Sequence, residues 1–97
     1  MKLSLLLYKT ALYLAVEKKN LKIIKLLLSN DKIDVNIINK SSKDEKSSLH
    51  LAVQRESIEI IKSLLSFKKT KINIKDSQGK KPIDYATNDE IIQLLNH

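Results

Sequence analysis

Residues 47–53 read Ser47-Ser48-Leu49-His50-Leu51-Ala52-Val53, and residues 10–16 read Thr10-Ala11-Leu12-Tyr13-Leu14-Ala15-Val16, a match at a shift of 37 positions. When the alignment is extended to the 27 pairs between residues 10–36 and 47–73, 12 pairs are identical, and most of these are apolar. Self-similarity at such a period is typical of stacked repeat proteins, because each unit buries its apolar side against the next unit. The repeat indicates a scaffold rather than a catalyst.

Each repeated unit predicts two short helices. In the first unit, apolar residues follow Thr10 at helical spacing from about residue 11 to 18, and a second stripe follows Asn20 over residues 21–28. Thr10 and Asn20 are residue types that cap helix N-termini with a side-chain oxygen. The second unit repeats the pattern, with Ser47 or Ser48 as the first cap and Ser57 as the second. Two helices joined by so short a turn form an antiparallel pair.

The segments between and after these units have their own signals. Residues 33–37 and 71–75 alternate polar and apolar side chains, which predicts brief extended segments, and Asp76-Ser77-Gln78-Gly79 predicts a turn. Near the end, Asn88 precedes Asp89, Glu90 and an apolar run, which predicts a capped final helix with acidic residues at its positive end. This last unit is shorter than the others, as expected for a terminal unit that packs on one side only.

These units resemble the ankyrin repeat, which has about 33 residues and a Thr-Pro-Leu-His-x-Ala core. Ser47-Ser48-Leu49-His50-Leu51-Ala52 matches that core with two serines in place of Thr and Pro, and residues 10–15 match it with Ala for Pro and Tyr for His. Lys81-Pro82-Ile83-Asp84-Tyr85-Ala86 keeps the Pro and the final Ala. The resemblance covers about residues 10–96. Lys19 and Glu56 stand where the family usually has a glycine with left-handed backbone.

The resemblance implies an all-α fold, an ankyrin-like α-solenoid of antiparallel helix pairs joined by β-hairpin-like loops. The chain then divides into an N-terminal segment (1–9), for which the remnant of a preceding repeat is one alternative, a first repeat with a long loop (10–46), a second repeat (47–80) and a truncated C-terminal capping repeat (81–97). Two and a half units lie at the lower edge of what such arrays need, so we expect marginal stability.

The resemblance also implies non-catalytic protein binding on the concave face, which the family builds from loop tips and the exposed ends of the first helices. Carried over position by position, the partner-binding residues are Glu17, Lys18, Lys43, Asp44, Lys46, Gln54, Arg55, Ser77, Gln78 and Lys80. Arg55 is the best single anchor, because arginine is enriched at interface hot spots. We expect a monomer that binds an acidic protein surface with modest affinity.

Catalysis, cofactors and metals are not expected. Ser47 and His50 could suggest a hydrolase, but in ankyrin-like repeats these positions hydrogen-bond to each other and tie one turn to the next. The chain has two histidines and no cysteine, which gives no metal-ligand spacing. Asn36 and Asn73 are expected to hold their turns through bonds from the side chain to the backbone.

The charge leaves a second class of function open. The formal net charge is +7, and of the 18 basic residues only Arg55 is an arginine. A basic module for nucleic acid or anionic membrane is the alternative, and its densest stretch is residues 68–75 with Lys80 and Lys81 beyond. Nucleic acid is the less favoured partner, because no aromatic residue interleaves these lysines to stack bases. A third alternative is an inactive fragment of a longer ankyrin array.

The start of the chain is not expected to be a signal peptide. The apolar run after Met1 is interrupted by Ser4 and ends at Lys9, and no small-residue cleavage site follows. No stretch approaches the length of a transmembrane segment. We therefore expect an intracellular, cytoplasmic protein, with the nucleus as an alternative.

Overall fold

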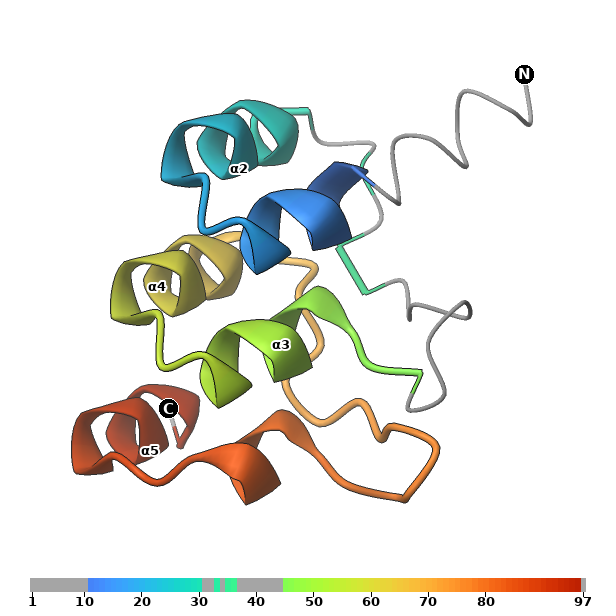
Figure 1. Ribbon diagram of the computed structural model, residues 1–97, viewed down its shortest axis with the longest axis vertical. Coiled ribbons are helices and arrows are strands. Elements are labelled where there is room, and N and C mark those ends of the chain that lie inside the picture. The colour runs from blue at the N-terminus through green and yellow to red at the C-terminus, as the bar shows by residue number, and fades with distance from the viewer. Residues whose placement is uncertain (1–10, 31–32, 34, 37–44, 97) are drawn as a thin grey trace.

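Three helix pairs stack along the long axis of the molecule (Figure 1). The computed structural model describes residues 11–30, 33, 35–36 and 45–96, so the predictions for residues 1–9, Thr10, Lys43 and Asp44 lie outside the described residues. Its helices are residues 11–17, α2 (Leu21–Leu28), α3 (Ser48–Gln54), α4 (Ile58–Ser66), the 3-10 helix η1 (Pro82–Tyr85) and α5 (Asp89–Leu95). We call residues 11–17 with α2 the first pair, α3 with α4 the second pair, and η1 with α5 the third pair.

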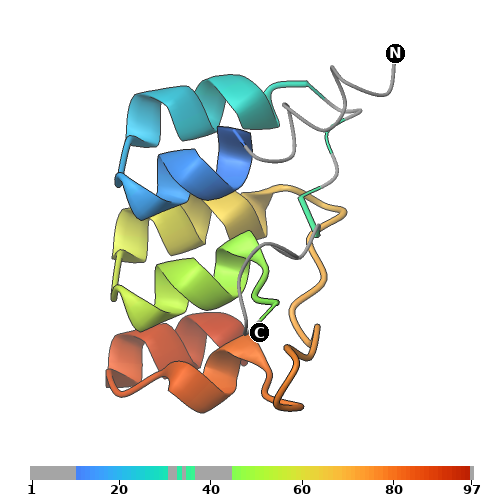
Figure 2. The same ribbon diagram turned by 45° about the vertical axis from the view of Figure 1, so that its right-hand side comes forward.

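The pairs are arranged as an inner and an outer row of helices with the loops on one side. Residues 11–17, α3 and η1 form the inner row, and α2, α4 and α5 form the outer row (Figure 1). The connecting loop between α4 and η1 projects from the opposite side to the turns within the pairs (Figure 2). Within each pair the helices run antiparallel. The predicted all-α solenoid is confirmed. Residues 72–73 and 77–78 of the second connecting loop form turns, and regular strand pairing is absent from the part of the chain that is described.

Three of the predicted caps, at Asn20, Ser47 and Asn88, are confirmed and one is not. Asn20 Oδ1 accepts from the Ile23 N–H at 3.2 Å at the start of α2, and Asn88 Oδ1 accepts from the Glu90 N–H at 2.8 Å at the start of α5. Ser57 stands at the predicted N-cap of α4, but its hydroxyl makes no capping hydrogen bond. The backbone of Ser57 (ψ 84°) is nearly the same as that of Asn20 (ψ 85°), which does cap its helix, so the backbone angle does not explain the missing bond and only the position of this cap was predictable.

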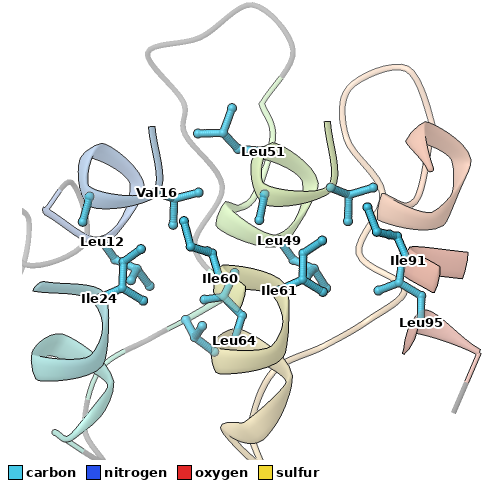
Figure 3. Close-up of a cluster of buried hydrophobic side chains, with 14 of the residues drawn as sticks. Leu12, Val16, Ile24, Leu49, Leu51, Ile60, Ile61, Leu64, Ile91 and Leu95 are labelled. Atoms are coloured by element: carbon cyan, nitrogen blue, oxygen red, sulfur yellow. The ribbon is translucent and has the colours of Figure 1, made fainter. Parts of the chain in front are cut away.

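The core is a continuous row of apolar side chains that runs through all three pairs (Figure 3). Equivalent positions of the two full repeats are buried alike: Ile24 and Ile61, 37 residues apart, are both 0% exposed. The apolar identities of the sequence repeat are therefore packing positions. The buried members are Leu12, Ala15, Val16, Ile24, Ile33, Val35, Leu49, Leu51, Ala52, Val53, Ile60, Ile61, Leu64, Ile91 and Leu95.

The turns inside the first two pairs share one geometry. Lys19 has φ 56° and Glu56 has φ 53°, both in the left-handed region. In the first pair the Asn20 N–H donates to Ala15 O at 2.9 Å, and the Lys19 N–H donates to Val16 O at 3.0 Å. The second pair has the same two bonds, from the Ser57 N–H to Ala52 O at 3.1 Å and from the Glu56 N–H to Val53 O at 3.0 Å. This is the Schellman arrangement, which requires left-handed backbone at the residue after the helix. The prediction that Lys19 and Glu56 take the place of a left-handed glycine is confirmed.

Replacing Lys19 with glycine should stabilise the protein. A side chain in the left-handed region costs about 1–2 kcal/mol, and the extra flexibility of glycine in the unfolded chain offsets about 0.5–1 kcal/mol of the gain. We therefore expect Lys19→Gly to raise the free energy of unfolding by about 0.5–1 kcal/mol in urea titrations. Lys19→Ala is the matched control, because it keeps the Cβ. An equal gain for both variants would contradict the strain argument.

Candidate partner-binding face

Four of the predicted partner-binding residues gather where the inner helices end. Glu17, Lys18, Gln54 and Arg55 are all exposed. The guanidinium of Arg55 donates from Nη1 to the backbone oxygen of Glu17 at 3.2 Å, so it bridges the first and second pairs. The structure thus brings together residues that lie 38 positions apart in the sequence.

A second group lies on the connecting loop between α4 and η1. We call residues 71–81 of this loop the finger. Ser77, Gln78 and Lys80 of the finger are exposed, as predicted for a loop tip. The finger projects on the side of the solenoid opposite the turn between α3 and α4 (Figure 1), so the two groups lie towards opposite ends of the inner helices.

Lys46 is placed differently from the other predicted residues. It is only 6% exposed, and its ammonium group lies 5.1 Å from the centroid of the Tyr85 ring. The ammonium of Lys80 approaches the same ring at 5.4 Å. Both distances are within the range of a cation–π interaction. Little of the Lys46 side chain is therefore available to a partner. Its ammonium group lies against Tyr85 instead.

The turn of the finger is held by the carboxylate of Asp76. Its Oδ1 accepts from the N–H groups of Gln78 and Lys80, both at 2.9 Å, and its Oδ2 accepts from the hydroxyl of Tyr85. The Asp76 N–H donates to Lys80 O at 2.9 Å, which closes the turn. Gly79, within this turn, has a left-handed φ of 77°. A single buried side chain thus fixes the loop conformation and joins it to η1.

His50 ties the second pair to the finger. Its Nε2 lies 2.8 Å from Lys80 O; because a carbonyl oxygen only accepts, Nε2 carries the hydrogen and donates. Nδ1 then accepts from the Ser47 N–H at 3.2 Å and lies 2.8 Å from Ser47 Oγ. Ser47 Oγ in turn accepts from the His50 N–H at 3.3 Å, which completes a capping box. Ser47 and His50 therefore form the structural tie that was predicted.

Tyr85 and Asn36 have larger roles than the sequence suggested. The ring of Tyr85 meets His50 edge-on, with centroids 6.0 Å apart, besides contacting Asp76 and the two lysines. Asn36 reaches the next connecting loop: its Nδ2 donates to Lys69 O at 2.8 Å, and its Oδ1 accepts from the Lys71 N–H at 2.6 Å. The expected bonds from Asn36 to the backbone are present, but they join two repeats rather than one turn. Since all these partners are distant in sequence, no local pattern predicts them.

The hydrogen bonds of Asp76 also control its ionisation. Burial alone would raise the pKa of Asp76, but the bonds from the Tyr85 hydroxyl and from the N–H groups of Lys80 and Gln78 outweigh it and hold the pKa below the ordinary value of 3.8. The carboxylate of Asp76 in turn raises the pKa of Tyr85 above 10.0, and burial adds to this effect. At neutral pH the ionised acid therefore accepts from the protonated phenol.

This pair should make the stability pH-dependent in acid. Because the folded pKa of Asp76 lies below its unfolded pKa, its stabilising effect is present above about pH 4 and is lost as the pH falls through the folded value. Asp76→Asn should lower the melting temperature at pH 7, and its melting curve should converge with that of the wild type below about pH 4. Thermal melts followed by circular dichroism from pH 7 to about pH 2.5 measure this. A gap between the two proteins that stays constant over that range would contradict the assignment.

The described part of the chain holds neither a metal-ligand cluster nor a helix suited to span a membrane. Among residues 11–30, 33, 35–36 and 45–96, no group of three or more His, Asp or Glu side chains is placed to hold a metal ion. None of the helices formed by these residues has the length and apolar character that a membrane crossing requires.

Comparison with known proteins agrees with the stacked pairs. A search among curated proteins found no match. A family model described as ankyrin repeats, in three copies, matches residues 12–97. This match covers nearly the whole chain and includes all three helix pairs, and ankyrin repeats are generally modules for protein–protein interaction. The chain belongs to the ankyrin repeat family.

Proposed function

We propose that this chain is a non-catalytic scaffold that binds a protein partner along its concave face. The proposed face consists of the exposed ends of the inner helices, at residues 17–18 and 54–55, and the tip of the finger at residues 77–80. The observation that carries the proposal is the fixed finger: the bonds of Asp76 and His50 set its backbone, while Gln78 and Lys80 remain exposed. A loop held in one conformation loses little entropy on binding, which favours affinity.

The charge of this face favours an acidic partner. Lys18, Arg55 and Lys80 are exposed on it, against one exposed acid, Glu17. Arg55 is the proposed anchor, because it already spans two repeats and offers further guanidinium donors beyond the one bound to Glu17 O. Lys46 is left out of the contact surface because it is buried beside Tyr85.

The remaining assignments follow from the sequence. We propose that the protein acts as a monomer in the cytoplasm, with the nucleus as an alternative, since it contains no cysteine and so needs no oxidising compartment. The repeats are proposed to divide at residues 10, 47 and 81.

The face can be tested with peptides selected from a displayed random library against the intact chain. We expect the selected sequences to be rich in Asp and Glu. Lys18→Glu with Arg55→Glu should weaken their binding at least about tenfold in fluorescence polarisation, because two favourable charges become repulsive. The control is Lys62→Glu, which makes the charge change of one of these two substitutions at an exposed position of α4 in the outer row, and it should leave binding unchanged.

Two outcomes would contradict the proposal. Undiminished binding by the double variant, with an unchanged far-UV circular dichroism spectrum, would show that the partner lies elsewhere. Preferred binding of labelled single-stranded RNA or duplex DNA, with a steep loss of affinity as salt rises, would favour the alternative basic module. The exposed Lys68, Lys69, Lys71 and Lys75 would be the candidate contacts for that module.

A further inference from the structure

The first pair exposes three large apolar side chains. Leu14 is 46% exposed, Ile23 43% and Leu26 70%, and these are the exposed large hydrophobic residues of the described chain. We call them, together with the neighbouring Lys22 and Lys25 of α2, the first-pair face. Single exposed apolar residues are ordinary, but three within one helix pair form a surface that needs an explanation.

The second pair shows how such a surface is normally covered. Leu51 and Ile60, the equivalents of Leu14 and Ile23, are only 7% and 4% exposed. Both point from the second pair towards the first (Figure 3), and α2 packs on α4. In the second pair, therefore, the surface equivalent to the one that the first pair exposes is covered by a neighbouring helix pair.

The opposite end of the solenoid is different. Ile91 of α5 is 0% exposed, whereas Glu90, Gln93 and Asn96 of α5 are exposed. Within the described residues no large apolar side chain is exposed in the third pair. The third pair thus has the polar outer side of a terminal unit, while the first pair has the apolar side of an internal one.

Charge distinguishes between the possible occupants of the first-pair face. Lys18, Lys19, Lys22 and Lys25 are all exposed in the first pair. Lys22 stands where the second pair has Glu59, and Leu26 stands where it has Ser63. Two copies meeting through this face would bring their lysines together, which disfavours a symmetric dimer and favours an acidic partner.

We propose that the first-pair face docks a partner that supplies an amphipathic helix pair with Asp or Glu beside its apolar stripe. It would pack as the first pair packs on the second, with its apolar stripe on Leu14, Ile23 and Leu26 and its acids near Lys22 and Lys25. This surface lies at the end of the stack and is separate from the concave face, so it does not depend on the function proposed above.

The probe for this proposal is a synthetic copy of residues 11–30, the helix pair that covers the equivalent surface within the molecule. In this peptide Glu replaces the four lysines, Lys18, Lys19, Lys22 and Lys25. Gln replaces the three exposed apolar residues, Leu14, Ile23 and Leu26. Only the side that packs on the second pair in the intact molecule then remains apolar. A second peptide that keeps the four lysines is its matched control. Binding to the intact, methyl-labelled chain is followed by NMR.

We expect the acidic peptide to shift the methyl signals of Leu14, Ile23 and Leu26 saturably, and the basic peptide to bind at least about tenfold more weakly. Lys22→Glu with Lys25→Glu in the protein should reverse this preference. Leu14→Gln, Ile23→Gln and Leu26→Gln together should abolish binding of both peptides. Because these side chains are exposed, circular dichroism should show the fold of both variants unchanged.

Four results would overturn the proposal. The first is the absence of saturable methyl shifts at millimolar acidic peptide, and the second is undiminished binding to the triple Gln variant. The third is sedimentation of the free chain as an oligomer that the triple Gln variant abolishes, which would make a second copy the occupant. The fourth is nuclear Overhauser contacts in the free chain between residues 1–9 and the methyl groups of these three side chains, which would make the chain its own occupant.

Discussion

Apolar packing between successive helix pairs is the interaction on which this fold depends. A pair of helices of seven to nine residues cannot bury its apolar stripe alone, and isolated helices of that length are unstable in water. Ile24, Ile61 and Ile91 are each fully buried in a different pair, so every pair completes its neighbour's core. Ile61 follows Ile24 by 37 residues, the period of the sequence repeat, and Ile91 of the shorter third pair follows Ile61 by 30.

Polar ties between repeats set the positions of the loops. Asn36 bonds to the backbone on both sides of Thr70, His50 reaches the backbone oxygen of Lys80, and Asp76 holds the finger turn. Each tie satisfies backbone groups that no helix or strand satisfies, which is why loops without regular strands can still have one conformation. The backbone of the finger is held in one conformation because the bonds of His50 and Asp76 end on it.

The same stacking that builds the core makes the two ends of the array unequal. Glu90, Gln93 and Asn96 are exposed on α5, whereas α2 exposes Ile23 and Leu26 beside lysines. The concave face and the first-pair face therefore differ in chemistry: one is a polar, basic surface with a fixed loop, and the other is an apolar surface with a basic border. Both are proposed to bind acidic partners, and only the second is proposed to bind a helical one.

The sequence by itself determined the helix pairs and the left-handed turns, because these follow from contacts within a few residues, and the repeated apolar positions marked the members of the core. Asn20 and Asn88 cap helices through bonds to the next two or three residues, and Lys19 and Glu56 close Schellman turns within one helical turn. Only the tertiary structure decided which predicted surface residues are available. Lys46 is buried because Tyr85, 39 positions later, folds against it, and Arg55 bridges to Glu17 because two inner helices lie side by side. Leu14 and Leu51 occupy equivalent positions, yet only Leu51 is covered, because burial depends on a neighbouring pair and not on local pattern.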